Sequence, residues 1–446
     1  MKLPTAPPSP WMEMLRALPD EQRERLVGRI SPVDAKGRYM HWQDVLDHLP
    51  PDGLDREAWW VSMKLGREGT ARQLPLTEKG GQPLQFSNVD EVQRCVHEID
   101  QQIGGRVGTP GDVSAERTRR FVRSLEEEAI TSSQLEGATT TRKEAKRLLA
   151  TGRAPRDISE QMIVNNYRAM MRAKEMVGAP LTPHAVLELH RIVTEGTLDD
   201  PSDAGRLQAP GDERIGVYAE DDGTLVHEPP RADQLPERLD ALCAFANGAT
   251  GKGFLHPVVR AIILHFMLSY DHPFSDGNGR TARALFYWSM LDSRYSLVEY
   301  VSISSLLKEA HAKYSRAFLH TETDDGDVTY FVLYQLGILM RAIHALWEYV
   351  DRRVAELHRL EMLVRRSDAL NHRQLALIRD ALHDPNVPVT IAEHQRAHDV
   401  TNETARSDLL ALEALGLYEK RKRGKAFNFL PRQGLEERLR ALGDAS

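Results

Sequence analysis

The sequence predicts a mainly α-helical protein that contains one β-hairpin and ends in a winged helix-turn-helix domain. Three observations support this fold class. Apolar residues recur at helical spacing through most of the 446 residues. Residues 213–230 place an Asp-Asp-Gly sequence between two short β-branched runs, which is typical of a hairpin. Residues 369–432 read as three short helices followed by two strands that meet at Gly424.

The length and composition exclude several classes of protein. A chain of 446 residues suggests roughly two to four domains with ample core. With only Cys95 and Cys243, neither a disulfide framework nor a zinc site is expected. The longest uncharged apolar stretch, 331–340, is too short to span a bilayer, and the N-terminus lacks the apolar core of a signal peptide. We therefore expect a cytoplasmic protein without membrane contact.

The chain begins with an N-terminal helical segment, residues 1–105, whose short helical signals include MHWQDVLDHL and DREAWWVSMKL. Its tryptophans, Trp42, Trp59 and Trp60, are expected to pack in a core, and no chemistry can be read from the segment. A central core, a linker helix, a C-terminal domain and a tail follow at residues 106–345, 346–368, 369–432 and 433–446. The linker repeats apolar residues at helical spacing, which also suits a dimer contact.

The most informative segment is the loop HPFSDGNGRTAR, His272 to Arg283, between two stretches that read as buried helices. Pro273, Gly277 and Gly279 interrupt any helix there. The second helix must therefore start at this loop. Backbone N–H groups in the first turn of a helix lack intrahelical partners and favour phosphate oxygens, and the glycines allow close approach.

The charged side chains of the loop suit nucleotide chemistry. Arg280 and Arg283 are three residues apart, so on a helix both project from nearly one face and can grip neighbouring phosphates. Asp276 suits Mg²⁺, which usually takes one or two carboxylates together with nucleotide phosphates. His272 can accept a proton near neutral pH. The loop therefore predicts a nucleotide-transfer site.

These residues resemble the signature of the Fic family (filamentation induced by cyclic AMP), H-x-F-x-[DE]-G-N-[GK]-R-x-x-R, at every specified position. The resemblance implies a Fic-type helical catalytic core with a β-hairpin flap, which transfers AMP from ATP to a hydroxyl side chain of a protein. The flap would be the hairpin at 213–230. Members that transfer the terminal phosphate instead carry Lys where this chain has Gly279, so kinase-type transfer is not expected.

The resemblance also implies a role for each matching residue. His272 would be the general base, Phe274 would anchor the loop, and Asp276 would hold Mg²⁺ between the phosphates of ATP. Nucleotide binding would fall to Gly277, Asn278, Gly279, Arg280 and Arg283.

A second motif, SSQLEG at Ser132 to Gly137, resembles the inhibitory motif [ST]-x-x-x-E-[GN] of one Fic subgroup. In that subgroup the glutamate pairs with the second arginine of the loop. The resemblance implies that Glu136 occupies Arg283, so that the γ-phosphate of ATP loses its clamp. Some members with this glutamate also remove AMP from the same target, and the direction stays open. The alternative is that Glu136 is an ordinary exposed helix residue.

Residues 369–432 follow the order of a winged helix-turn-helix, with Asn402 as the expected cap of its third helix. Basic residues crowd the wing and suit DNA phosphates: Lys420, Arg421, Lys422, Arg423 and Lys425. From Asn371 to Arg432, however, ten Lys or Arg face eight Asp or Glu, a net charge of only +2. A module for dimerisation or target recruitment is the alternative to DNA binding.

Two functions are consistent with the sequence. The first is an autoinhibited protein adenylyltransferase that uses ATP and Mg²⁺ and acts on a hydroxyl of a protein target, which includes itself as a candidate. The second is a DNA-binding regulator whose Fic core serves as a nucleotide sensor or for self-modification. The full set of His272, Asp276, Arg280 and Arg283 favours the enzyme, because a sensor does not need the base. A homodimer that stabilises the inhibitory helix is also expected.

Overall fold

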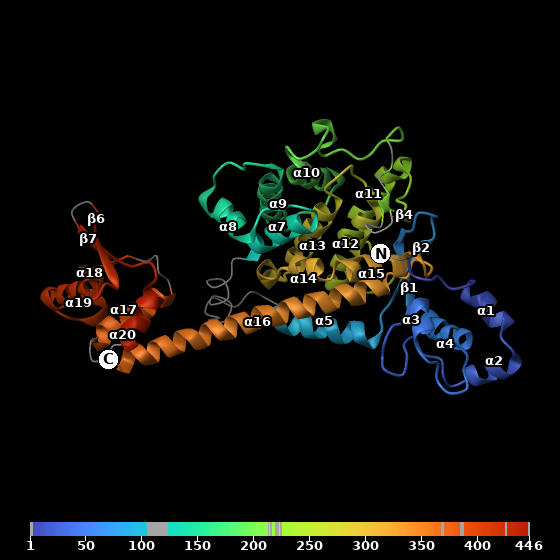
Figure 1. The fold of residues 1–446 in the computed structure, drawn as a ribbon, viewed down its shortest axis with the longest axis horizontal. Coiled ribbons are helices and arrows are strands. Elements are labelled where there is room, and N and C mark those ends of the chain that lie inside the picture. Colours follow the sequence, from blue (N-terminus) through green and yellow to red (C-terminus); the bar gives the residue numbers. More distant parts are fainter. Residues whose placement is uncertain are drawn as a thin grey trace. The chain divides into compact units, whose positions relative to one another are not determined.

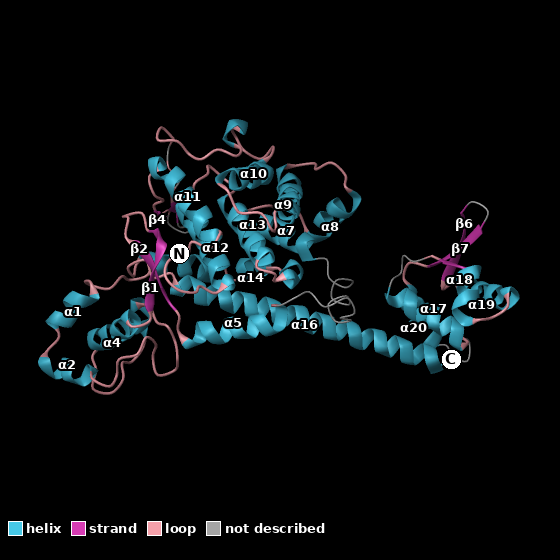
Figure 2. Ribbon diagram, turned by 180° about the vertical axis from the view of Figure 1, so that it is seen from behind, coloured by secondary structure: helices cyan, strands magenta, loops and turns pink. Residues whose placement is uncertain are grey.

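A computed structural model describes residues 3–104, 124–212, 214, 216–218, 223, 225–366, 370–383, 388–423 and 426–444. These residues are mainly helical and include three small antiparallel sheets (Figures 1 and 2). The predicted mainly α-helical class is therefore confirmed. The described residues divide into two compact units, the first up to His344 and the second from Ala345 onwards.

The first unit begins with short helices and a small sheet. The elements are α1 (Trp11–Ala17), α2 (Asp20–Leu26), α3 (Trp42–Asp47), α4 (Arg56–Glu68), β1 (Ala71–Thr77), β2 (Pro83–Ser87) and α5 (Asp90–Ile103). Trp42, Trp59 and Trp60 are buried together in the core of this segment. The sequence predicted only helices here, so the β1–β2 hairpin corrects the assignment. Pro75 lies in the middle of β1, and a proline there argues against reading the segment as a strand. In the structure it falls where the register of the two strands shifts between Gln73 and Thr77.

The centre of the first unit is a set of packed helices. The elements are α7 (Ser124–Leu135), α8 (Arg142–Thr151), α9 (Ile158–Glu175), α10 (Pro183–Thr194), η1 (Pro201–Asp203), β3 (Val217–Tyr218), β4 (Leu225–His227), η2 (Ala232–Gln234), α11 (Leu235–Ala246), α12 (Pro257–Asp271), α13 (Asn278–Asp292), η3 (Ser296–Tyr300), α14 (Ile303–Glu309) and α15 (His311–Glu322). Helices α12 and α13 are buried on most faces, as their apolar sequences predict. Strands β3 and β4 form the predicted hairpin, although the Asp-Asp pair at 221–222 lies outside the described residues.

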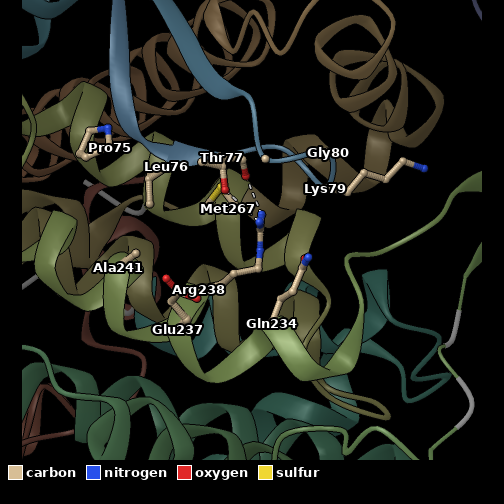
Figure 3. Close-up of a pocket in the computed structure, with 11 residues that line it drawn as sticks. Pro75, Leu76, Thr77, Lys79, Gly80, Gln234, Glu237, Arg238, Ala241 and Met267 are labelled. Carbon is tan, nitrogen blue, oxygen red and sulfur yellow. Dashed lines mark hydrogen bonds between the residues drawn. The ribbon is translucent and has the colours of Figure 1, made fainter.

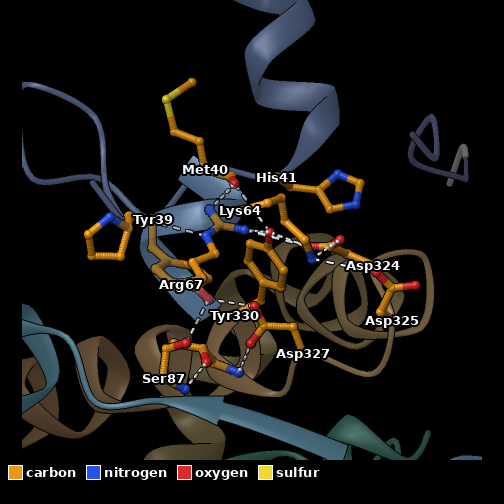
Figure 4. Close-up of polar contacts among 12 residues, drawn as sticks. Tyr39, Met40, His41, Lys64, Arg67, Ser87, Asp324, Asp325, Asp327 and Tyr330 are labelled. Atoms are coloured by element: carbon orange, nitrogen blue, oxygen red, sulfur yellow. Dashed lines mark hydrogen bonds and ion pairs between the residues drawn. The ribbon is translucent and has the colours of Figure 1, made fainter. Parts of the chain in front are cut away.

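A buried polar cluster joins the N-terminal helices to the chain that follows α15 (Figure 4). Lys64 and Arg67 on α4 both reach the carboxylate of Asp324, at 2.7 and 3.4 Å. The Tyr330 hydroxyl donates to the same carboxylate at 2.8 Å. Burial raises the pKa of Asp324, but the two cations outweigh that effect and lower it overall. The cluster therefore fixes helix α4 against the chain that follows α15.

Helix α16 (Thr329–Arg366) runs for 38 residues, and its first part lies beside α5 in both views (Figures 1 and 2). By length and composition alone, its segment Thr329–Arg352 qualifies as a membrane span. The sequence-based expectation that the chain has no segment long enough to span a bilayer was therefore too strict. However, 67% of the apolar window is buried inside the protein, as in a core helix of a globular protein.

The second unit contains a three-stranded sheet and four further helices. The elements are α17 (His372–His383), β5 (Val389–Thr390), α18 (Ile391–His398), α19 (Asn402–Ala414), β6 (Tyr418–Arg423), β7 (Ala426–Pro431) and α20 (Leu435–Asp444), with strand order β5-β7-β6. Leu409, Leu412 and Phe429 lie in its core. The Thr401 hydroxyl caps α19, one residue before the expected Asn402. Gly424 and Lys425 lie outside the described residues.

Candidate active site

The loop between α12 and α13 is built around the side chain of Asn278. Its Oδ1 accepts from the backbone N–H of Phe274 at 3.0 Å, and its Nδ2 donates to the carbonyl of Phe274 at 2.9 Å. The ring of Phe274 is fully buried. Just before it, His272 adopts a left-handed backbone conformation with φ 43° that ends α12. The Asn278 hydrogen bonds and the burial of Phe274 therefore fix the conformation of the loop.

His190 on α10 supports the same loop from behind. Its Nδ1 accepts from the backbone N–H of Gly205 at 2.9 Å, so its Nε2 carries the proton and donates to the Asp276 carbonyl at 2.8 Å. Its ring stacks on Phe274 with centroids 3.7 Å apart. Burial lowers the pKa of His190 to about 4, which keeps the ring neutral. Sequence reasoning missed this residue, because a single histidine within a helical pattern carries no local signal.

The turn that leads into α13 leaves no room for larger residues. Gly277 has φ 80°, and a Cβ there would lie 2.7 Å from Cγ2 of Thr194. Gly277 is followed at once by the first turn of α13, whose N–H groups are available to an anion. Asn278 and Gly279 form the start of this turn, as the loop sequence predicts.

Arg280 and Asp276 form one ionic pair at this turn. The guanidinium of Arg280 is fully buried and donates to Oδ2 of Asp276 at 2.8 Å and to the Val193 carbonyl at 3.2 Å. The Asp276 side chain is 54% exposed, so it can reach an ion that keeps several waters. A partly exposed carboxylate beside a helix N-terminus fits Mg²⁺ and the phosphates that accompany it.

Arg283 contacts the segment that resembles the inhibitory motif. Its Nη2 lies 2.8 Å from Oε1 of Glu136, its Nε donates to Oγ of Ser132 at 2.8 Å, and its Nη2 also reaches the Ser132 carbonyl at 3.2 Å. Burial lowers the pKa of Arg283, but the nearby acidic groups, with Glu136 first among them, together outweigh burial and raise the pKa overall. Glu136 follows the last residue of α7, and Gly137 ends the helix with φ 94°.

Helix α7 is anchored firmly behind Glu136. The buried carboxylate of Glu128 accepts from Oγ of Ser302 at 2.9 Å, from the N–H of Ser304 at 3.1 Å, and from Oγ of Ser304. On another side, the Asn166 amide donates to the Ala129 carbonyl at 3.1 Å. These bonds hold α7 between α9 and α14, so the position of Glu136 is well defined.

The imidazole of His272 is neutral. Burial, followed by the nearby charges of His227 and Arg214, lowers its pKa to about 4. Its Nδ1 lies 3.2 Å from Nδ2 of Asn278. Because Oδ1 of Asn278 is already an acceptor for Phe274, Nδ2 is the donor in this contact, and the neutral ring then carries its proton on Nε2.

A cavity of about 220 Å³ lies beside His272 and Arg283, whereas Asp276 and Arg280 do not line it. Glu136, His272, Gly279 and Arg283 line one side of it. The flap strands and helix α15 supply most of the remaining lining, which includes the apolar wall of Val217, Val226, Tyr314, Phe318 and Leu319. The cavity therefore combines an ionic end with an apolar wall, as a nucleotide site requires.

A larger cavity of about 390 Å³ lies between the β1–β2 turn, α11 and Met267 (Figure 3). None of the site residues predicted from the sequence lines it. Arg238 within it is already engaged, at 2.7 Å from Asp271 Oδ1 and 2.6 Å from the Thr77 carbonyl. Arg238 therefore holds Asp271, the residue that precedes His272, against strand β1.

The chain was compared with known proteins. Residues 180–290 match the family model described as Fic/DOC family. The protein adenylyltransferase Fic of Nematostella vectensis is 35% identical over 107 residues, 24% of this chain and 22% of the relative. The protein adenylyltransferase Fic of Aedes aegypti is 26% identical over 263 residues, 55% of this chain and 48% of the relative. The chain thus spans about half or less of the length of these relatives.

A solved structure was also found to be similar. A Fic family protein from Desulfovibrio desulfuricans is 21% identical, with a TM-score of 0.49, over 78% of this chain and 97% of that chain. The family model covers the loop from His272 to Arg283 but begins after the segment from Ser132 to Gly137. Residues 180–290 therefore resemble the Fic/DOC family, and the chain is similar at low identity to proteins named as protein adenylyltransferases.

Proposed function

We propose that this protein is an adenylyltransferase that moves AMP from ATP to a hydroxyl side chain of a protein. The observation that supports this most strongly is the single loop that brings His272 and Arg283 to one cavity and places Asp276 beside the first turn of α13. The hydroxyl oxygen attacks the α-phosphorus, the bond to the bridging oxygen breaks, and pyrophosphate leaves. The hydroxyl proton passes to the neutral ring of His272.

The remaining charges bind and orient the nucleotide. The N–H groups of residues 278–280 face the phosphates, with Arg283 as the clamp for the γ-phosphate. Asp276, held by Arg280, is the ligand for Mg²⁺, which supplies positive charge between the phosphates when it is bound. The apolar wall that includes Phe318 is left for the nucleoside.

We propose that the described state is the inhibited one. Glu136 pairs with Arg283 and leaves the γ-phosphate without its clamp. In addition, the Asn278 amide engages the only basic nitrogen of the neutral His272 ring, so proton uptake requires this contact to open. To keep activity near 1%, the inhibited state must be favoured by about 2.7 kcal/mol. A charge-assisted contact between the partly exposed Glu136 and the buried Arg283 can supply that energy.

The test is intact mass spectrometry after incubation with ATP and Mg²⁺, on wild type, Glu136→Gly, and Glu136→Gly with His272→Ala. We expect an adduct with the mass of AMP on the Glu136→Gly protein, little on wild type, and none on the double variant. No adduct on any form, with ATP binding retained, would favour the nucleotide-sensor function instead. Loss of a preformed adduct in wild type but not in Glu136→Gly would show that the same site removes AMP.

A second proposal concerns the C-terminal unit, which we propose is a winged-helix domain that binds duplex DNA. Its order of helix, strand, two helices and two strands, with sheet order β5-β7-β6, supports this. Strand β6 has the sequence YEKRKR, in which the Lys420 ammonium stacks over the Phe427 ring at 4.3 Å. Dimerisation or target recruitment is the competing role for this unit. Separately, we propose that the protein is located in the cytoplasm.

The DNA proposal is tested with the full chain. Lys420→Gln with Lys422→Gln should weaken binding to duplex DNA and lower the slope of affinity against salt, by roughly one phosphate contact per residue removed. Lys143→Gln with Arg147→Gln, on exposed faces of α8, removes the same charge elsewhere and should leave the slope unchanged. Equal effects from the two pairs would leave only a general charge effect and refute a DNA site in β6.

A further inference from the structure

His227, at the end of flap strand β4, makes hydrogen bonds with both nitrogens of its ring. Nδ1 lies 2.8 Å from Oε2 of Glu322 on α15. Nε2 lies 2.7 Å from the backbone carbonyl of Tyr270, two residues before His272. The histidine is buried, at 7% exposure, and it lines the same cavity as His272. It thus connects the flap, the end of α12 and α15 at one point.

Both partners of His227 are acceptors. A backbone carbonyl oxygen never donates, and the Glu322 carboxylate is acceptor-only when ionised. A neutral imidazole has one N–H and one lone pair, so it can satisfy only one of the two. Both contacts are hydrogen bonds only when the ring carries a proton on each nitrogen, and the bond to Glu322 is then charge-assisted.

We propose that His227 is a positioning residue that works as a buried imidazolium, latching the flap to Glu322 and to the carbonyl of Tyr270. The proposal deepens and rests on the proposed adenylyl transfer, because the flap and the catalytic loop serve that reaction. The latch sets where strand β4 lies relative to His272. Its positive charge also favours the neutral form of His272, the form that accepts the hydroxyl proton.

The charges around His227 are compatible with a cation. From α15 it faces Glu322, and from α12 it faces the buried carboxylate of Asp271, which Arg238 already pairs at 2.7 Å. On its own segment, Glu228 is taken by Lys79 from the β1–β2 turn at 3.0 Å. The ring of Tyr270 lies 4.9 Å away.

Two further cationic or titratable groups stand on the loop side of His227. They are His272 itself and Arg214 at the base of the flap, which donates to the His272 carbonyl at 3.1 Å and to the Asp271 carbonyl at 2.8 Å. His227 and Arg214 both act to lower the pKa of His272, after burial, the largest cause. Loss of the His227 charge should therefore raise the pKa of His272.

Glu322→Gln separates the charge of the latch from its geometry. A glutamine amide has nearly the shape of a glutamate carboxylate but can donate to Nδ1, so a neutral His227 ring keeps both hydrogen bonds. His227→Gln, by contrast, cannot bridge both partners. His184 on α10 is exposed and offers a control, since His184→Asn removes a histidine without touching the latch.

The first measurement is the ¹⁵N spectrum of histidine-labelled full-length protein at about pH 7. The signals of His227 are assigned by their loss in His227→Gln. We expect both ring nitrogens of His227 to be protonated in wild type, and a neutral ring with its proton on Nε2 in Glu322→Gln. A neutral His227 in wild type would overturn the proposal. Because this measurement needs no transfer reaction, it stands or fails independently of the proposed function.

The second measurement is transfer kinetics in the Glu136→Gly background. His227→Gln should lower kcat/KM for the protein target by roughly tenfold, the effect of losing one hydrogen bond to a charged group. Glu322→Gln should lose much less near neutral pH, but its activity should begin to fall at a higher pH on acidification. An acid limb that is unchanged in Glu322→Gln, with normal folding, would exclude an effect of the latch charge on His272. His184→Asn should match the background in both measurements.

Discussion

The carboxylate of Glu136 fills the space that a side chain at Gly279 would need. A Cβ at Gly279 would lie 2.2 Å from Oε1 of Glu136 and 2.9 Å from Nη1 of Arg283. In this conformation the Glu136–Arg283 contact therefore leaves no room for a Cβ at residue 279. The position of the Glu136 carboxylate thus depends on the absence of a side chain at Gly279.

Gly279→Ala should consequently displace Glu136 and activate the enzyme. The glutamate is the more mobile neighbour, since it is 32% exposed while Arg283 is 1% exposed. We expect the rate of self-modification to rise about tenfold over wild type, equivalent to about 1.4 kcal/mol. In the Glu136→Gly background the same substitution should give no rise. Additive effects in this double-mutant cycle would show that the two residues act separately.

The pH dependence of transfer should reflect the buried position of His272. A base with a pKa of about 4 is already neutral at pH values where an ordinary histidine, with a pKa near 6.5, is protonated. In Glu136→Gly at saturating ATP and Mg²⁺, the rate near pH 5.5 should stay within about twofold of the rate near pH 7.5. A rate that halves near pH 6.5 would mean that His272 titrates as an exposed histidine.

Glu128→Ala should loosen the inhibitory helix without touching the nucleotide site. The substitution removes the acceptor for Ser302 and Ser304 and leaves their donors unsatisfied, at a cost of about 1–3 kcal/mol for each buried group. Hydrogen exchange in α7 should accelerate, and self-modification should rise. Faster exchange without increased activity would show that Glu136 holds Arg283 even when the helix is mobile.

Asp324→Ala should be the most destabilising of these changes. It leaves the buried cations Lys64 and Arg67 without their shared partner, which should cost roughly 3–5 kcal/mol. The neighbouring Asp325→Ala is a matched control, because Asp325 is 58% exposed and its contact with Lys64 is 3.6 Å, worth at most about 1 kcal/mol. Thermal unfolding of both variants makes the comparison. Similar melting temperatures would refute a structural role for the buried cluster.

The helical class was predictable because its signal is local. The apolar sequence of α12 and α13 and the glycines between them define two buried helices and the turn that joins them. The partners of that turn were not predictable. His190 meets Asp276 from 86 residues away, and Glu322 meets His227 from 95 residues away, so no sequence window contains either pair. The candidate catalytic residues were predicted from the loop sequence and its family resemblance. The residues that hold the loop in place could be identified only from the folded structure.

The nucleotide turn is already in place before any ligand arrives, since Asn278, His190 and Arg280 hold it through their own hydrogen bonds. Relief of the proposed inhibition therefore requires no refolding of the loop, only a rotation of the Glu136 side chain away from Arg283 and the opening of the contact between Asn278 and His272. Exposed side chains rotate in picoseconds to nanoseconds, whereas packed elements move in microseconds to milliseconds. The rate of activation would then be set by the binding event that displaces Glu136, and the inhibited state would re-form rapidly once that partner leaves.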